Sequence, residues 1–366
     1  MCSGRLNKIR SSGRNMMRFG NNISRRTAMG VVVGAAVTPF VGSKSASAQQ
    51  TIRLTMASSH PTALAWVGPL QTVVTRSNEI LEEQGSRYRI DWTESYGGQL
   101  YGLTETMEAL TQNIADGGWV GALFEPSDLP LNNIPFATPF TTSTVGQALQ
   151  IMDNLNRNEQ VMIDEWARQD LIYFGSCGSD GYSILSREPL DDISELQGRR
   201  VVGVPVLAPW IEPLGASLVA SGLPEMYSQL HAGVGDAVLI VGTGALPLRL
   251  HEVAPYITKV DTGPFTFGGF CMNKTVFEGL PEEVQAVLAG LGQVYTDENQ
   301  ARIEALQDTV FDTMVSQGAT LREMPREEKV RWVEAMPDLG LNWVEANEAP
   351  GVPARDILRS FMAEAV

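Results

Sequence analysis

The stretch that decides the fold reads Leu-Gln-Gly-Arg-Arg-Val-Val-Gly-Val-Pro at residues 196–205. It continues through Leu-Gly-Ala-Ser at 214–217 to Pro-Glu-Met-Tyr-Ser-Gln-Leu at 224–230. Val201 to Val204 is mostly β-branched and predicts a half-buried strand that the next proline ends. The later proline and glutamate suit the first turn of a helix, where a missing N–H and a negative charge are both favourable. Ala237 to Val241 is an apolar run that predicts the next strand. Strand, helices and strand in this order predict one unit of an α/β fold.

The rest of the chain alternates in the same way, because stretches with helical spacing follow the apolar runs. We expect strands near 52–56, 88–92, 118–124, 171–177, 182–185, 200–204, 237–241 and 267–272, and helices near 66–80, 103–112, 145–169, 245–252 and 280–317. The strands fall into two lobes that exchange segments. We expect lobe I at 49–174 with about 262–300 and lobe II at 175–261 with about 301–366. The helix at 280–317, interrupted mildly by Gly290 and Gly292, is expected to brace both lobes.

Charge is distributed unevenly along the 366 residues. The first 48 residues hold eight Lys and Arg and no Asp or Glu, so the other 318 carry 19 basic and 42 acidic side chains, a formal net charge of −23. Such an acidic chain argues against nucleic acid and anionic membrane surfaces as partners. A content of 43% hydrophobic and 19% charged residues is typical of globular proteins.

The basic N-terminus predicts export. Arg25 and Arg26 precede an apolar run from Ala28 to Val41, and Ala46-Ser-Ala48 follows as a small-residue cleavage site. This order is typical of a signal peptide over residues 1–48, here of the twin-arginine type. An ordinary secretory signal and an uncleaved anchor are the alternatives, although the run is short for a membrane span. We expect cleavage before Gln49 and a periplasmic mature protein.

We find none of the common motifs for enzyme or cofactor sites. Gly-x-Ser-x-Gly, a P-loop, Gly-x-Gly-x-x-Gly after a strand and His-Glu-x-x-His are all absent from the sequence. The three histidines, His60, His231 and His251, are scattered, and no cluster has metal-ligand spacing. We therefore expect a protein that is not an enzyme and that needs no metal or cofactor.

Two cysteines remain after the expected cleavage, Cys177 and Cys271. Both lie on strands that we expect to cross between the lobes side by side. They could form a disulfide if their Cα atoms lie within about 7 Å. Two isolated, small, buried thiols are the commoner arrangement.

The opening stretch also carries a family resemblance. Its order of Leu-x-Gly-basic-basic, Leu-Gly-Ala-Ser and Glu-x-Tyr-x-x-Leu-x-x-Gly-x-x-Asp resembles the extracytoplasmic solute receptors of TRAP transporters, the DctP family. Further matching pieces are Gly97-Gly-Gln-Leu, Ile134-Pro-Phe, Glu252-Val-Ala-Pro-Tyr and Leu280-Pro-Glu-Glu-Val. The resemblance runs from about Ile52 to about Gly318. It implies a two-lobed α/β fold like that of periplasmic binding proteins, a small organic solute bound in an interlobe cleft, and delivery of that solute to integral membrane subunits.

The residues that hold the ligand in this family are not all present. The family's arginine on the strand after Leu-x-Gly falls on Val202, and a second family arginine falls on Tyr182. Polar positions after the family's Gly-x-x-Asp-Gly are replaced by an apolar run that includes Ile240. We therefore expect a ligand other than a typical C4-dicarboxylate. Arg199 and Arg200 match ordinary basic positions outside the cleft, and the alternative is that one of them faces it, since strand alternation permits only one to do so.

Aromatic side chains lie at or near the segments expected to face the cleft, namely Trp66, Trp119, Phe124, Tyr182 and Trp210, and the carboxylates Asp180 and Glu125 are close to two of them in the sequence. An aromatic site with a carboxylate could hold a small amine through cation–π and charge contacts. For any one aromatic residue, core packing is the commoner role. The candidate ligand-binding residues are Tyr182, Val202, Trp210, Trp119, Asp180 and Ile240.

Two other functions stay open at this point. The chain could serve an ATP-driven importer as a receptor of similar shape, which neighbouring genes for membrane subunits or for an ATPase would distinguish. It could also be a secreted enzyme on a two-lobed scaffold. A receptor is stabilised by its ligand and leaves it unchanged, so a thermal-shift screen separates binding from turnover.

Overall fold

The computed structural model describes residues 49–365, so the expected signal peptide at 1–48 lies outside the described part of the chain. The described residues form strands β1 (Gln50–Ala57), β2 (Tyr88–Ser95), β3 (Gly117–Val120), β4 (Leu171–Ser179), β5 (Tyr182–Ser186), β6 (Arg200–Gly203), β7 (Ser217–Ala220), β8 (Ala237–Val241), β9 (Tyr256–Lys259), β10 (Phe265–Asn273) and β11 (Thr320–Glu323). The helices are α1 (Gly68–Glu83), α2 (Thr106–Thr111), α3 (Ile134–Ala137), α4 (Val145–Asn158), α5 (Gln160–Arg168), α6 (Ala208–Ile211), α7 (Leu223–His231), α8 (Gly242–Ala245), α9 (Lys274–Glu278), α10 (Glu282–Gln307), α11 (Val310–Ser316), α12 (Arg326–Ala335), α13 (Leu339–Asn347) and α14 (Ala354–Ala365).

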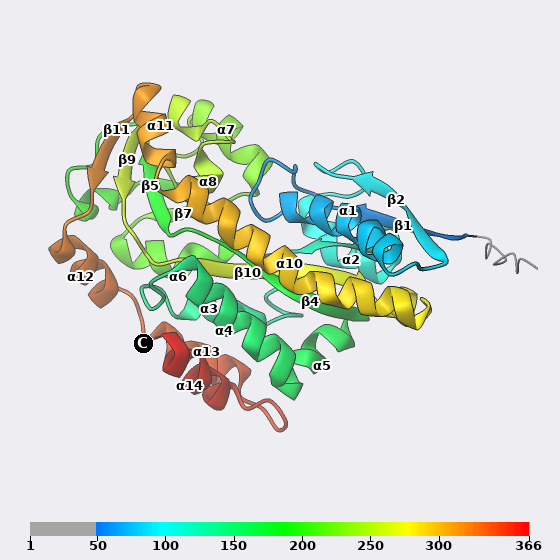
Figure 1. The fold of residues 1–366 in the computed structure, drawn as a ribbon. Helices are drawn as coiled ribbons and strands as arrows, with labels where there is room; N and C mark the ends of the chain where they lie inside the picture. The colour runs from blue at the N-terminus through cyan, green and yellow to red at the C-terminus, as the bar shows by residue number, and fades with distance from the viewer. Residues whose placement is uncertain (1–48, 366) are drawn as a thin grey trace, which may run out of the picture. The chain divides into compact units, whose positions relative to one another are not determined.

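The strands form two mixed sheets, as the alternating pattern predicted (Figure 1). The first sheet has the order β2-β1-β3-β10-β4, in which β1 is parallel to β2 and β3, and β10 is antiparallel to β3 and β4. The second has the order β11-β9-β5-β8-β6-β7, with β6 parallel to β7 and β8, and β5 antiparallel to β8 and β9. The α/β class with two lobes is therefore confirmed.

Three short strands were not predicted from the sequence. β7, β9 and β11 have four residues each, and none of them is buried along its whole length. A strand this short and this exposed shows no clear apolar alternation. Two expected helices are also divided. Glu159 is extended between α4 and α5, and the chain breaks again between α10 and α11.

Two chain segments pass between the sheets. Asp180 and Gly181 link β4 to β5, and residues 260–264 link β9 back to β10. The two links are bonded to each other, because the Tyr182 N–H donates to Thr262 Oγ1 at 2.8 Å. Strand exchange between two sheets through adjacent links is the arrangement expected from the sequence, and it places a potential hinge at these residues.

Helix α10 braces the molecule as predicted. It packs along α1 and β4 beside the first sheet and reaches α8 beside the second (Figure 1). Gly292 lies where α10 crosses β4: a Cβ at this position would be 2.0 Å from the Phe174 carbonyl oxygen. Gly290, two residues earlier, faces open space. Gly292 thus permits close contact between α10 and β4, which a larger side chain would prevent.

The C-terminal segment has elements beside both sheets. α14 packs on α4, next to the first sheet, through an apolar cluster that includes Ile151, Leu155, Ile357 and Phe361. In the range 301–366, β11 belongs to the second sheet, and α11 and α12 pack beside it. The contacts of α12 include a hydrogen bond from Trp332 Nε1 to the Trp210 carbonyl oxygen. The amphipathic pattern of α14 predicts a buried face but does not say which partner covers it.

Cys177 and Cys271 are both buried free thiols, so the disulfide that the sequence left open is absent. They lie on adjacent strands, but Cys177 faces Gly268 in the register, whereas Cys271 is opposite Tyr173 and Gly118. The offset along the strands explains why they do not pair. Within residues 49–365, no helix combines the length and the hydropathy needed to cross a bilayer.

Candidate functional site

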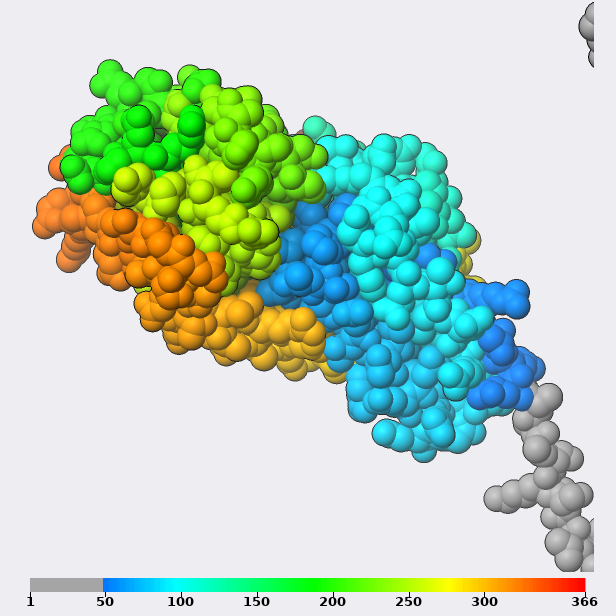
Figure 2. All heavy atoms as spheres, turned by 90° about the horizontal axis from the view of Figure 1, so that it is seen from above, coloured from blue at the N-terminus to red at the C-terminus, as the bar shows by residue number. Residues whose placement is uncertain are grey.

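A cavity lies where the carboxyl ends of parallel strands from both sheets approach each other. Its empty volume is about 420 Å³, including space that opens to solvent. In the space-filling view, the blue and cyan segments that carry β1 to β3 and the green segments of the second sheet meet in this region (Figure 2). Strand ends between two sheets are a usual place for small-molecule sites in α/β proteins. The wall consists of His60, Trp66, Trp119, Leu123, Phe124, Tyr182, Val204, Leu223, Met226, Leu239, Ile240, Val241 and Phe267.

The first sheet contributes an aromatic half of the wall. His60 follows β1 in a turn and stacks on Trp119 of β3, with ring centroids 4.6 Å apart. Phe267 of β10 meets Trp66 edge to face at 5.1 Å, and Phe124 meets Trp119 edge to face at 6.3 Å. These edge-to-face contacts are favourable for aromatic rings, so the rings hold one another in place.

His60 is the most unusual side chain of the wall. It is 2% exposed, and burial lowers its pKa to about 3, so the ring is neutral at physiological pH. Its Nδ1 accepts a hydrogen bond of 3.0 Å from Trp66 Nε1. Among the described residues, its Nε2 has no hydrogen-bond partner.

The second sheet contributes a mostly aliphatic half. Leu239, Ile240 and Val241 come from β8, and Leu223 and Met226 come from α7. Tyr182 at the start of β5 is the polar side chain on this side. Burial, followed by the charge of Asp180, raises the pKa of the Tyr182 hydroxyl, so that it stays protonated.

Polar residues of α10 form hydrogen bonds with the backbone of the segment that carries Trp66. Tyr295 donates its hydroxyl to the Trp66 carbonyl oxygen at 2.6 Å, and Asn299 Nδ2 donates to the Ala65 carbonyl oxygen at 3.0 Å. Asn299 Oδ1 also accepts from the Gly178 N–H at 2.8 Å. The bracing helix therefore fixes the turn that carries Trp66 to the end of β4.

Three of the six predicted site residues line the cavity. Tyr182 and Ile240 lie in the half from the second sheet, and Trp119 lies in the half from the first. Trp119 has no exposed surface, and its Nε1 donates to Cys177 Sγ at 3.1 Å. A buried indole that also walls a cavity serves both the core and the site.

The other three predicted residues lie outside the wall. Val202 has no exposed surface and packs inside the second sheet against the turn at Gly235, while Val204, two residues later, reaches the cavity. Trp210 lies behind Tyr182, with ring centroids 5.5 Å apart, and donates its Nε1–H to the Phe136 carbonyl oxygen. Its contacts are those of a core residue, which is the commoner role for an aromatic side chain.

Asp180 holds the link between the sheets together. Its carboxylate accepts hydrogen bonds from the Thr243 N–H and hydroxyl and from the Ser179 hydroxyl. Burial raises its pKa, and these hydrogen bonds oppose that shift. Asp180 is not part of the cavity wall. Its oxygens already have hydrogen-bond partners at the start of α8, so its role is structural.

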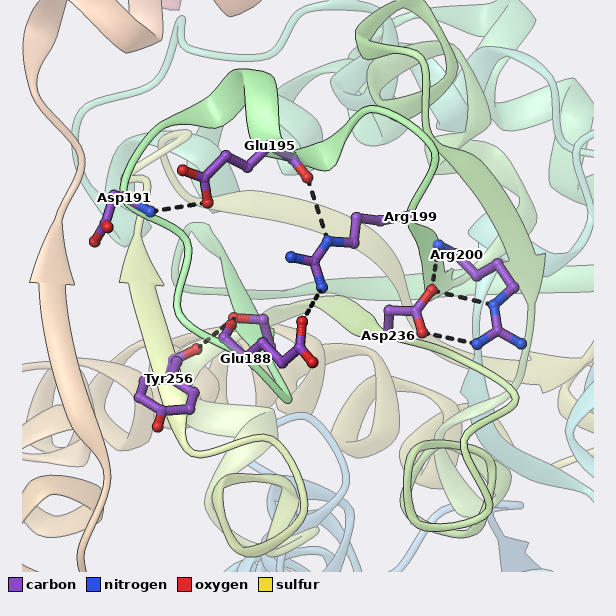
Figure 3. A network of polar contacts seen from close by, with 8 residues as sticks. Glu188, Asp191, Glu195, Arg199, Arg200, Asp236 and Tyr256 are labelled. Atoms are coloured by element: carbon purple, nitrogen blue, oxygen red, sulfur yellow. Dashed lines mark hydrogen bonds and ion pairs between the residues drawn. The ribbon is translucent and has the colours of Figure 1, made fainter.

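Arg199 and Arg200 lie at the amino end of β6 and pair with carboxylates there (Figure 3). Neither belongs to the cavity wall. Arg199 donates to Glu188 at 2.8 Å, and Arg200 makes a bidentate contact with Asp236 through Nε at 3.1 Å and Nη2 at 2.7 Å. Hydrogen bonding by Arg200 lowers the pKa of Asp236. The arginines that follow Leu-x-Gly are thus paired with carboxylates outside the cavity wall, the position that the sequence predicted.

Sequence reasoning missed much of the wall. His60 was judged only as one of three scattered histidines. Trp66 and Phe124 were among the aromatic residues expected near the cleft, and both line the cavity. Phe267, Leu223 and Met226 gave no signal beyond ordinary apolar spacing. Among residues 49–365, no group of His, Cys, Asp and Glu is arranged to hold a metal ion.

Comparison with known proteins places this fold and site in a family. Residues 75–345 match the DctP family model, described as bacterial extracellular solute-binding protein, family 7. A solute-binding protein of Sulfitobacter sp. (strain NAS-14.1) is 26% identical over 215 residues, which are 57% of this chain and 62% of that relative, less than two thirds of its length.

Solved structures share the fold. A TRAP periplasmic solute-binding protein from the same Sulfitobacter strain, with bound β-D-galacturonate, has a TM-score of 0.71 at 19% identity, over 86% of this chain and all of that one. The ectoine-binding protein of the TeaABC TRAP transporter from Halomonas elongata has a TM-score of 0.72 at 18% identity, over 86% of this chain and 99% of that one. The family match, which covers most of the chain, and this shared fold show that the chain belongs to the DctP family of bacterial extracellular solute-binding proteins.

Proposed function

We propose that this protein is the periplasmic solute receptor of a TRAP transporter, the tripartite, ATP-independent kind. It captures a small organic solute between its two sheets and delivers it to integral membrane subunits. The observation that carries the proposal is the cavity, whose wall comes from both sheets and which lies beside two bonded links. A ligand that contacts both halves favours the closed arrangement of the sheets through its differential contacts.

The receptor needs no catalytic step and no cofactor in this proposal. Family membership supports a binding role, because the matched family and the relative from Sulfitobacter are described as solute-binding proteins. Export through the cleaved signal at 1–48 would bring the receptor to the periplasm, where it meets the membrane subunits. The TRAP proteins among the structural neighbours favour this transporter over an ATP-driven importer.

The ligand in this proposal is not a C4-dicarboxylate. Val202 and Tyr182 occupy the positions where the family places arginines, and Arg199 and Arg200 have carboxylate partners elsewhere. The described residues of the wall include no Arg or Lys. Burying an unpaired anion costs several kcal/mol, so a dicarboxylate has no means of offsetting its desolvation here.

A thermal-shift screen of the exported protein against a metabolite library tests the proposal. A solute at 100 times its Kd raises the free energy of unfolding by about 2.7 kcal/mol, which the melting curve resolves. Tyr182→Ala removes one face of the cavity and should abolish the shift. Tyr227→Ala, at a half-buried position of α7 outside the wall, is the matched control and should keep it.

Two further readouts complete the test. The bound solute should be recovered chemically unchanged, and its uptake by cells should depend on this gene and on an ion gradient. Turnover of the solute, or uptake that survives collapse of the gradient and stops when ATP is depleted, would exclude a TRAP receptor.

A further inference from the structure

The neutral tautomer of His60 is set by its neighbour. An indole N–H can only donate, so the Trp66 Nε1–H that bonds His60 Nδ1 at 3.0 Å requires Nδ1 to be the unprotonated nitrogen. A neutral imidazole carries one proton, which must then be on Nε2. The contact with Trp66 thus turns His60 into a hydrogen-bond donor at its second nitrogen.

This donor has no partner in the described part of the protein. His60 Nε2 is buried and unbonded, although buried polar groups nearly always find a hydrogen bond. The other polar hydrogens of the aromatic half are taken, since Trp66 Nε1 bonds His60 and Trp119 Nε1 bonds Cys177. Because His60 belongs to the wall of the cavity, we expect a ligand atom to meet this buried, unpartnered N–H.

The charge of the wall restricts that ligand atom. Within the described residues, the wall contains no Asp, Glu, Lys or Arg, so neither an anion nor a cation finds a countercharge. The carboxylate of Asp180, two residues before Tyr182 in the chain, already accepts hydrogen bonds from Ser179 and Thr243. A positive charge would also face the positive end of the His60 N–H dipole.

We propose that His60 Nε2–H is the hydrogen-bond donor that determines the specificity of the site. This inference rests on the proposed receptor function. It receives a single uncharged acceptor, such as the carbonyl oxygen of a small, largely apolar ketone, lactone or lactam. The aromatic and aliphatic walls take up the hydrocarbon part. The Tyr182 hydroxyl, across the cavity, is the second polar side chain that can orient the solute.

Matched probes separate this ligand class from the others. Calorimetric titrations would use cyclohexanone and δ-valerolactam as carbonyl probes, methylenecyclohexane as the same shape without an acceptor, cyclohexanecarboxylate as an anion and tetramethylammonium as a cation. The carbonyl probes should bind at least 10-fold more tightly than the other three, because only they satisfy the buried donor.

Substitutions at position 60 then test the donor. His60→Leu should weaken the carbonyl probes about 10- to 100-fold and leave methylenecyclohexane within 2-fold. His60→Gln, which keeps an N–H donor, should retain part of the preference. His231→Leu, at an exposed histidine of α7, should change nothing.

A measurement on the unaltered protein keeps the inference testable even if these variants fold poorly. Nitrogen-15 NMR of labelled histidine should show His60 as the neutral Nε2–H tautomer at pH 7. A charged ring or an Nδ1–H tautomer would overturn the inference.

The possible failures can be told apart. If the anion or the cation binds best, or if His60→Leu keeps the carbonyl preference, the inference is wrong and the receptor function stands. If neither the probes nor any member of the metabolite library binds the wild-type protein, the receptor function itself is wrong.

Discussion

Replacing Gly292 by Ala tests whether α10 positions the cavity. The new Cβ would lie 2.0 Å from the Phe174 carbonyl oxygen and 2.6 Å from its carbonyl carbon, so helix and strand must separate by about 1 Å. Overpacking of this kind costs about 1–3 kcal/mol, against a gain of up to about 1 kcal/mol in helix propensity. Gly290→Ala is the matched control, because it gains the same propensity in open space.

The two variants should therefore move in opposite directions. At about 2–4 °C per kcal/mol, Gly292→Ala should melt a few degrees below the wild type, and Gly290→Ala about 1–3 °C above it. Tyr295 and Asn299 connect α10 to the turn at Trp66, so Gly292→Ala should also weaken ligand binding. Circular dichroism melts and calorimetry measure both effects. A Gly292→Ala protein that is as stable and binds as tightly as Gly290→Ala would refute this role of the glycine.

Three further outcomes follow from buried or terminal groups. His60 has a pKa of about 3 when folded and 6.5 when unfolded, so the unfolded chain binds one more proton between these values and the free energy of unfolding should fall as pH drops through this window. Urea titrations at several pH values should give a plot of unfolding free energy against pH that is about 1.4 kcal/mol per pH unit steeper for the wild type than for His60→Gln. Equal slopes would contradict this. Thiol titration should find Cys177 and Cys271 unreactive in the folded protein and both free after unfolding without reductant, whereas a loss of both thiols would reveal a disulfide. Mass spectrometry of the exported protein should place its N-terminus near Gln49, and intact residues 1–48 would argue against cleavage.

The fold was largely predictable because its signals are local. The β-branched run at Val201 to Val204, the apolar run at Ala237 to Val241 and the helical spacing after Leu280 each depend on nearby residues only. The short strands β7 and β11 were missed because their pairing partners, not their own composition, make them strands. The position of α14 on α4 likewise depends on a contact between segments about 200 residues apart.

The site was predictable only in part, for a related reason. Tyr182 and Ile240 were found by counting from motifs, and Trp119 by its place on an apolar strand. Val202 follows from the same counting, but the strand ends before the cavity begins, so Val204 takes that place. His60 could not be found, because its role depends on Trp66 in the next turn and on Trp119 in another strand. None of these distances is visible in the sequence.

In the proposed function, the cavity receives an uncharged organic solute between the two sheets and does not receive a dicarboxylate. Calorimetric titration of the exported protein with succinate, malate and the strongest uncharged solute from the thermal-shift screen tests it most directly. Both dicarboxylates should bind with a Kd weaker than about 1 mM, or roughly −4 kcal/mol, whereas the uncharged solute should bind much more tightly and lose its binding in Tyr182→Ala. Micromolar binding of succinate or malate, lost on replacing Arg199 or Arg200 by Ala, would contradict it.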